Sequence, residues 1–284
     1  MQCRLCRNKS NIVESHIIPK FVAKWLKDSS ATGYIRQAVN PNLRKQDFPT
    51  IKLLCADCEE RFSLWEKRFA EAIFFPFHKD GQKKFEYDNW LLSFAVSLSW
   101  RVGTVELENF RKLKPNLVAP LEEALSNWSA FLLGKSPVEE LYEHHILFLG
   151  FVVDSTDIKL PEGFHWYILR SIDATLPANS SEIAVYTKLP CIVFFSGVQP
   201  SKLTGWKSTQ IFQRGTIETA SQEVRNIRFG EFLKYRVIEA GRASSAMSEK
   251  QEKIVSTTML KDPDRTIKSR SFEVNFIDWY WEKK

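Results

Sequence analysis

Residues 3–6, CRLC, and residues 55–58, CADC, decide how the N-terminal part of this chain folds. Each stretch places two cysteines three positions apart, so both thiolates of a pair can reach one ion from a tight turn. Two such pairs supply four sulfur ligands, which complete a tetrahedral shell: Cys3, Cys6, Cys55 and Cys58. Because four protein ligands leave no open coordination position, we predict a structural zinc ion and not a catalytic one.

The fifth cysteine and the start of the chain indicate the cellular setting. Cys191 lies alone in the apolar run CIVFF and is expected to be a buried core residue. The chain begins MQCRLCRNKS, without the apolar segment of an export signal, and its longest apolar run is far shorter than a bilayer span. We therefore predict a cytoplasmic protein without a membrane partner, a setting in which paired cysteines favour metal over disulfides.

The positive charge is confined to the region that holds the cysteine pairs. Residues 1–84 contain 16 Lys and Arg against 9 Asp and Glu, a net charge of +7, whereas residues 85–284 contain 24 against 25, a net charge of −1. A compact positive module suits binding to a phosphate backbone, because neutralising phosphates releases condensed counterions. A surface that only keeps the protein soluble would have the same composition, so both interpretations stay open.

A polar stretch, HKDGQKK at residues 78–84, separates two aromatic-rich segments and marks the expected domain boundary. Residues 1–84 form the predicted zinc module, and residues 85–284 form a larger domain. Within the module, Pro19 can open one helix, and a second is expected from about residue 57 to residue 75, beginning on the second cysteine pair.

The larger domain has the pattern of an α+β fold with a mainly antiparallel sheet. Helices are expected at residues 90–102, 117–133 and 229–240. Strands are expected at residues 144–153, 164–172, 183–186 and 190–195, with a polar stretch at 262–270 and a terminal aromatic strand at 274–281. The predicted fold class is therefore α+β, with a small zinc-bound module before a larger domain.

The segment between the two cysteine pairs points to a family. A plain zinc ribbon leaves roughly 15 to 20 residues between its pairs, whereas 48 residues separate Cys6 from Cys55. The inserted segment contains ESHIIP at residues 14–19, in which His16 lies between a short β-like run and a proline that opens a helix. This order of a cysteine pair, a histidine in such a setting and a second pair that opens a helix resembles the zinc-knuckle branch of the HNH, or ββα-metal, endonucleases. The resemblance covers about residues 1–75.

The resemblance implies a treble-clef-like ββα-metal module in which His16 is the general base that activates water. It also implies a catalytic divalent ion, Mg²⁺ or Mn²⁺, that polarises the scissile phosphate. Glu59 stands where the family has a histidine ligand, and a carboxylate is an acceptable ligand for a hard ion. The sequence departs from the family at Ser15, where Asp or His is usual, and at Thr50, where Asn is usual.

Several of these residues have simpler interpretations. His16 has two alternative interpretations, a structural histidine and a spare zinc ligand, and Glu59 can be an acid stabilised by the helix dipole in a first turn. Asparagines 40 and 42 are candidates to orient His16, or are turn formers. The remaining candidates are expected to be structural histidines or solvated charges: His144, His145, Glu60, Glu66 and Glu71.

Three functions follow from these patterns. The first is a metal-dependent endonuclease that hydrolyses phosphodiester bonds in nucleic acid, with DNA favoured over RNA, and analogy suggests a role in bacterial genome defence. Its larger domain would select the substrate, sense a signal or mediate assembly with a protein partner or a second copy. The second is a nucleic-acid-binding protein on a degenerate HNH fold that has lost catalysis, as Ser15 and Thr50 would permit. The third is a protein-interaction module with a purely structural zinc ion.

Overall fold

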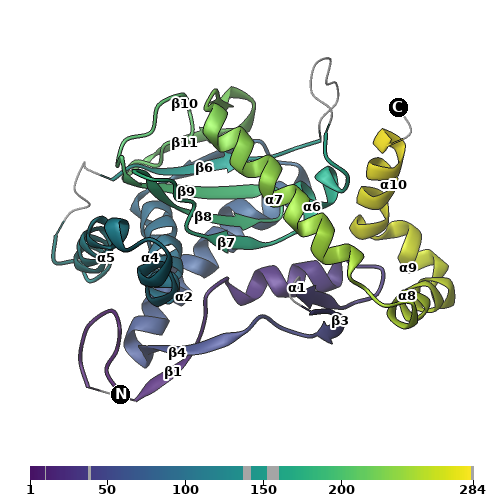
Figure 1. Ribbon diagram of the computed structural model, residues 1–284, viewed down its shortest axis with the longest axis horizontal. Helices are drawn as coiled ribbons and strands as arrows, with labels where there is room; N and C mark the ends of the chain where they lie inside the picture. The colour runs from purple at the N-terminus through teal and green to yellow at the C-terminus, as the bar shows by residue number, and fades with distance from the viewer. Residues whose placement is uncertain (10, 38–39, 137–141, 152–159, 283–284) are drawn as a thin grey trace.

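The chain combines a small N-terminal hairpin-and-helix unit, a layer of central helices and a four-stranded sheet (Figure 1). The computed structural model describes residues 1–9, 11–37, 40–136, 142–151 and 160–282. This mixture of helices and antiparallel sheets agrees with the predicted α+β class. In the described ranges, none of the helices is both long and apolar enough to span a membrane.

The N-terminal unit is built on two antiparallel strands that are distant in the sequence, β1 (Ile12–His16) and β4 (Thr50–Cys55). The chain between them forms helix α1 (Lys20–Asp28), which begins directly after Pro19, and a small hairpin of β2 (Ile35–Gln37) and β3 (Asn40–Lys45). Helix α2 (Ala56–Phe69) starts at the residue that follows β4 and packs against both β1 and β4.

Helix α2 is the first part of a longer helical run than the sequence pattern predicts. It continues through a π-helical turn (Ala70–Phe74) into α3 (Phe75–Asp80), which ends at Gly81 with a left-handed φ of 66°. The buried side chains Phe62, Phe69 and Ile73 recur at helical spacing along one face. The helix predicted at residues 57–75 is therefore present and extends beyond both ends of its predicted range.

Helix α4 (Asn89–Leu113) is the centre of the molecule. The Asp88 side chain accepts a hydrogen bond from the Trp90 N–H, which caps the helix start. All residues from 90 to 103 are buried, because α4 packs against α2, against α5 (Val118–Leu132) and against the sheet. A Cβ at Gly103 would lie 2.9 Å from a methyl group of Leu125, so glycine permits the close approach of α4 and α5. The helices predicted at residues 90–102 and 117–133 are therefore confirmed as α4 and α5, and α4 is longer than expected.

The four-stranded sheet has the order β6-β9-β8-β7 and is antiparallel throughout. Its strands are β6 (His144–Phe148), β7 (Asp173–Thr175), β8 (Ile183–Leu189) and β9 (Ile192–Gln199). Helix α4 covers one face, and α7 (Ile227–Ser245) lies across the other, where Phe229 packs on Phe195 (Figure 1). The region predicted as a strand at 144–153 ends as β6 at Phe148, and its last two residues lie outside the described residues.

Shorter strands and helices complete the chain. Strand β5 (Lys84–Tyr87) pairs with β11 (Gly215–Glu218), and β10 (Trp206–Lys207) pairs with β12 (Glu223–Val224). After α7, helices α8 (Glu249–Lys261) and α9 (Pro263–Lys268) lead to α10 (Arg270–Glu282). The stretch predicted to be polar at 262–270 is mostly helix α9, which is capped by the Asp262 side chain.

Two predicted strands are helices. The segment 164–172 forms α6 (Phe164–Arg170), and the segment 274–281 belongs to α10. The Asp278 carboxylate of α10 accepts hydrogen bonds from the backbone N–H groups of His165 and Trp166, the first turn of α6. The two helices therefore stabilise each other, and this tertiary cap overrides the strand preference of their aromatic residues.

Buried apolar residues on both sides of residue 84 form one continuous cluster, which includes Cys55 and Phe69 before it and Leu91 and Ile217 after it. The division into residues 1–84 and 85–284 stays a prediction. Cys191, expected in the core, is buried.

Candidate metal centre and its neighbouring histidine

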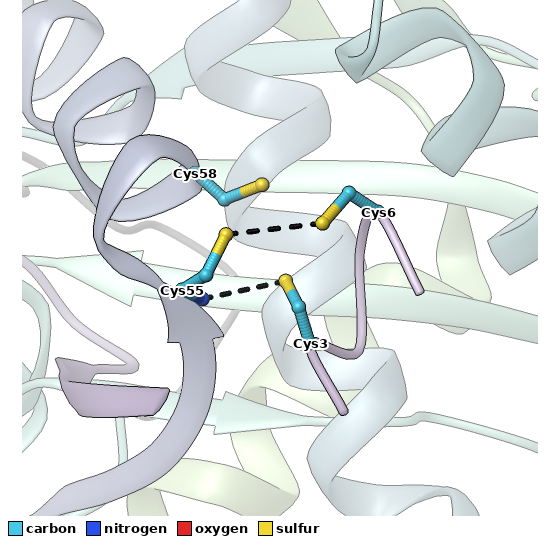
Figure 2. Close-up of side chains that lie close together, drawn as sticks. All are labelled: Cys3, Cys6, Cys55 and Cys58. Carbon is cyan, nitrogen blue, oxygen red and sulfur yellow. Dashed lines mark hydrogen bonds between the residues drawn. The ribbon is translucent and has the colours of Figure 1, made fainter. Parts of the chain in front are cut away.

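Four cysteines from two distant segments meet at the base of α2 (Figure 2). Cys3 and Cys6 lie in the N-terminal loop, Cys55 ends β4, and Cys58 lies in the first turn of α2. All four Sγ atoms lie within 4.8 Å of one another, and those of Cys6 and Cys55 are 3.8 Å apart. Four Zn–S bonds of about 2.3 Å in a tetrahedron require S–S separations of about 3.8 Å. The cluster can therefore hold one tetrahedral ion.

The surroundings of the cluster favour thiolate at one position and oppose it at two others. Burial raises the pKa of Cys3, but hydrogen bonds from the backbone N–H groups of Cys6, Cys55 and Leu5 outweigh it and lower that pKa to about 7. Burial raises the pKa of Cys6 and that of Cys58. A bound cation would supply the charge that lets all four ligands ionise, and binding would release protons.

His16 lies at the end of β1, opposite Thr50 of β4. Its Nε2 is 3.4 Å from Oδ1 of Asp47, and its side chain is 20% exposed. Asp47 lies in the connection between β3 and β4, and Lys20 approaches its other oxygen at 3.7 Å. Nε2 is buried and makes no hydrogen bond, so its approach to Asp47 is an ion-pair contact only. Within the described residues, Nδ1 makes neither a hydrogen bond nor an ion pair, so it is able to accept a proton.

Asp47 is the functional candidate that the sequence interpretation missed. Its proximity to His16 depends on the pairing of β1 with β4, which the local sequence does not specify. Asn42, one of the two candidates to orient His16, is engaged elsewhere through its side-chain oxygen, which accepts a hydrogen bond from the backbone N–H of Ser248.

Ser15 and Glu59, two of the three departures from the family pattern, are bonded to each other. The Ser15 hydroxyl donates a hydrogen bond of 2.7 Å to Oε2 of Glu59, and Ser15 is fully buried. Because successive side chains of a strand point to opposite faces, Ser15 faces α2 whereas His16 faces the Asp47 loop. The described residues thus give two separate pairs, His16 with Asp47 and Ser15 with Glu59, and no hydrogen bond or ion pair within these residues joins the two pairs.

The cysteine cluster is the one group of three or more His, Cys, Asp or Glu side chains in the described part of the chain that can hold a metal. His16 is not a member, which argues against its interpretation as a spare zinc ligand. Any second ion at Glu59 would have to take its remaining ligands from water and substrate.

Arg101 of α4 fixes the backbone of the His16 segment from inside the protein. Its guanidinium is fully buried and donates hydrogen bonds to the His16 carbonyl at 2.8 Å and to Oε1 of Glu66 at 2.6 Å. Glu66 was expected to be solvated, but its side chain is only 18% exposed. It follows Phe62 by four residues and precedes Phe69 by three, so it lies on the α2 face that packs on α4.

We predict that Glu66→Ala lowers the free energy of unfolding by about 3–5 kcal/mol, because it leaves the Arg101 charge buried without its partner. Glu66→Gln keeps a hydrogen-bond acceptor and should cost less. Glu60→Ala, at an exposed site on the same helix, is the matched control and should change stability by no more than about 0.5 kcal/mol. Urea unfolding of the three variants makes the comparison, and equal midpoints for Glu66→Ala and Glu60→Ala would refute the role of the pair.

The pair His144 and His145 is structural, as predicted. Both side chains are buried, with Nδ1 of His144 2.7 Å from the Ser196 hydroxyl and Nδ1 of His145 2.9 Å from the Thr209 hydroxyl. Burial lowers the pKa of His144 to about 3 and that of His145 to about 4. Both side chains are therefore neutral rings that pack around strand β6.

Comparison of the chain with protein-family models, with curated proteins and with solved structures gives no match.

Proposed function

We propose that this protein is a zinc-stabilised, metal-dependent endonuclease that hydrolyses phosphodiester bonds, with DNA favoured over RNA. The observation that supports it best is the His16–Asp47 pair at the end of β1, in a unit whose β1 and β4 strands pack on a helix that begins at the cysteine cluster. A histidine with one nitrogen beside a carboxylate and the other nitrogen free has the arrangement of a general base.

In this proposal the four cysteines hold a structural zinc ion, and its closed shell leaves the chemistry to other residues. His16 takes a proton from the attacking water through Nδ1, and Asp47 orients the ring and stabilises the positive charge that forms on it. Arg101 keeps the end of β1 in place through the His16 carbonyl. The proton acceptor is thus positioned from two sides.

The divalent ion of the proposal would be held by Glu59, whose Oε2 is held in place by the buried Ser15 hydroxyl. Mg²⁺ is commonly bound through one or two carboxylates, with water and substrate phosphates filling its other positions, so one carboxylate fits this ion. When bound, it would neutralise charge on the scissile phosphate.

A non-catalytic nucleic-acid-binding protein is the second candidate. The observation that favours it is the hydrogen bond between Ser15 and Glu59, which ties up an oxygen of the one acid proposed as an ion ligand. A cleavage assay with added Mg²⁺ or Mn²⁺ separates the two functions. Cleavage that requires the added ion, and that stops on mild chelation while zinc content is unchanged, supports the nuclease. Binding of nucleic acid without cleavage under any divalent ion supports the second candidate.

Nucleic-acid affinity should fall steeply with salt, because the cations of the +7 segment would displace counterions from phosphates. Lys20 and Lys24 are exposed on α1, the helix that follows His16. The double variant Lys20→Gln, Lys24→Gln should reduce the slope of log K against log salt by up to about 2, since each phosphate contact contributes about 0.9.

The matched control removes two equally exposed lysines at the far end of α4, Lys112→Gln with Lys114→Gln. Fluorescence anisotropy with a labelled DNA duplex at several salt concentrations measures both slopes. A slope that falls equally in the two double variants would show that binding is not centred on the His16 region.

A further inference from the structure

A cavity of about 540 Å³ that no cysteine of the cluster lines lies between the end of α1, helix α3 and the corner that joins α9 to α10. The end of α6 and the turn at Cys191 form its floor. Helices α1, α6, α9 and α10 lie toward the right of Figure 1. Arg170 of α6 donates a hydrogen bond to the Leu26 carbonyl of α1. The volume is within the range of about 300–1,000 Å³ that is typical of small-molecule sites.

The lining of this cavity is strongly positive. Of the described residues that line it, four carry a positive charge and one, Asp28, carries a negative charge; the cations are Lys83, Arg265, Lys268 and Arg270. Lys83 follows the end of α3, and the other three lie in α9 and at the start of α10. An anion inside the cavity would therefore meet cations from two separate segments of the chain.

Two of these cations are held in position by the protein. Nε of Arg265 donates a hydrogen bond to the Ser30 carbonyl at 3.2 Å, and Arg270 donates to Glu273 at 2.6 Å and stacks over the Phe151 ring. Lys268 makes no hydrogen bond or ion pair with the described residues. A ligand would find two preoriented guanidinium groups and one ammonium group that is free to turn toward it.

The electrostatic effect of these cations reaches the cavity wall. His78, which lines the cavity, has its pKa lowered to about 3, first by burial and then by the charges of Arg270 and Arg170. At Cys191 burial raises the pKa, and Lys83 and Arg270 are among the cations that oppose it. Repulsion between these like charges weakens when an anion enters.

The remaining lining suits a ligand with a polar and an apolar part. Ser29 and Ser30 add polar groups to the lining, and Phe77 and Phe151 are among its apolar residues. Phe151 is 38% exposed, so one of these rings is accessible to a flat group.

We propose that this cavity binds a small ligand that carries two or more linked phosphate groups. One phosphate alone could not contact Lys83 and the α9–α10 corner as well as a diphosphate, whose charge extends along its length. Two sources share this chemistry, a nucleoside diphosphate or triphosphate and a free pyrophosphate, and the rings of Phe77 and Phe151 would favour the nucleotide.

Isothermal titration calorimetry on the full chain, in buffer without Mg²⁺, tests the proposal with pyrophosphate and with ADP as separate probes. We expect one site per chain. Lys83→Glu and Lys268→Glu should each weaken binding about tenfold or more, because each loses a charge-assisted contact and introduces repulsion. Lys261→Glu, an equal charge change at an exposed site on α8 outside the cavity, is the control and should bind as the wild type does.

Tighter binding of ADP than of pyrophosphate identifies the nucleotide as the ligand class, and equal binding identifies the diphosphate group alone. The proposal is overturned if neither probe gives a heat of binding at millimolar concentration. It is also overturned if both cavity variants bind with the affinity of the wild type. Displacement of ADP by a short single-stranded oligonucleotide overturns it as well, because the cavity would then belong to a nucleic-acid surface. Tryptophan fluorescence gives a second measurement that needs no change of charge. ADP should quench the fluorescence of the wild type, and this quenching should be lost in Trp25→Phe, because Trp25 lines the cavity.

Discussion

Replacing Cys55 by serine is expected to release the metal ion and to unfold the N-terminal part of the protein. A serine hydroxyl is a poor ligand for zinc at neutral pH, and three thiolates leave the coordination shell open. Ions in small zinc modules contribute on the order of 10 kcal/mol to folding. Cys3 and Cys55 also belong to the apolar cluster that includes Phe62 and Phe69, so the damage should extend into α2.

Elemental analysis and urea unfolding check this prediction together. The wild type should contain about one zinc ion per chain, and Cys55→Ser should contain far less and unfold at lower urea. Cys191→Ser is the control, because Cys191 is buried away from the cluster and should leave metal content unchanged. Equal zinc content in the wild type and in Cys55→Ser would show that the four thiols do not form the site.

The features that the sequence predicts well are those set by local spacing. Two residues between cysteines fix how a pair can face an ion, and the structure brings all four sulfur atoms together. The apolar repeat through Phe62 and Phe69 predicts α2, and the uniformly apolar run from Trp90 predicts a central helix. In each case the local pattern and the tertiary packing require the same structure.

The features that the sequence could not predict depend on partners that are distant in the chain. Helix α6 needs the Asp278 carboxylate more than a hundred residues away to cap its first turn, whereas its own aromatic residues favour a strand. Likewise, Asp47 reaches His16 only through the pairing of β1 with β4. The spacing of Glu66 to Phe62 and Phe69 places it on the inner face of α2, but no pattern within α2 reveals its partner, Arg101 of α4.

Replacing His16 by alanine is expected to remove most of the proposed cleavage activity while the protein keeps its zinc and its fold. General-base catalysis typically contributes about 10² to 10⁴ in rate, so cleavage should fall by that factor. The ring lies outside the cysteine cluster, and Arg101 bonds to the backbone carbonyl of residue 16, which alanine retains. Zinc content, the unfolding midpoint and nucleic-acid affinity should therefore stay near those of the wild type.

Variants of the two carboxylates separate the steps of the proposed mechanism. Glu59→Gln should weaken the binding of the divalent ion, so added Mn²⁺ should partly restore its cleavage, whereas no metal concentration should restore His16→Ala. Asp47→Asn keeps the size of the side chain but loses the charge beside Nε2, and it should reduce cleavage less than His16→Ala does. The relative loss of cleavage in the three variants, together with its response to added metal, distinguishes this mechanism. It is expected only if His16 is the base, Asp47 orients it and Glu59 is a separate ligand of the ion.

Three results of the His16→Ala measurement would change the interpretation in different ways. Cleavage equal to that of the wild type would mean that His16 is not the base, even though the protein is a nuclease. Loss of zinc together with unfolding would make His16 a structural residue and favour the non-catalytic nucleic-acid-binding protein. Absence of cleavage in the wild type, on DNA and RNA with Mg²⁺ and Mn²⁺, would remove the main support for the enzyme. The salt-dependent binding of the Lys20 and Lys24 variants would then decide whether the basic segment binds nucleic acid without cutting it.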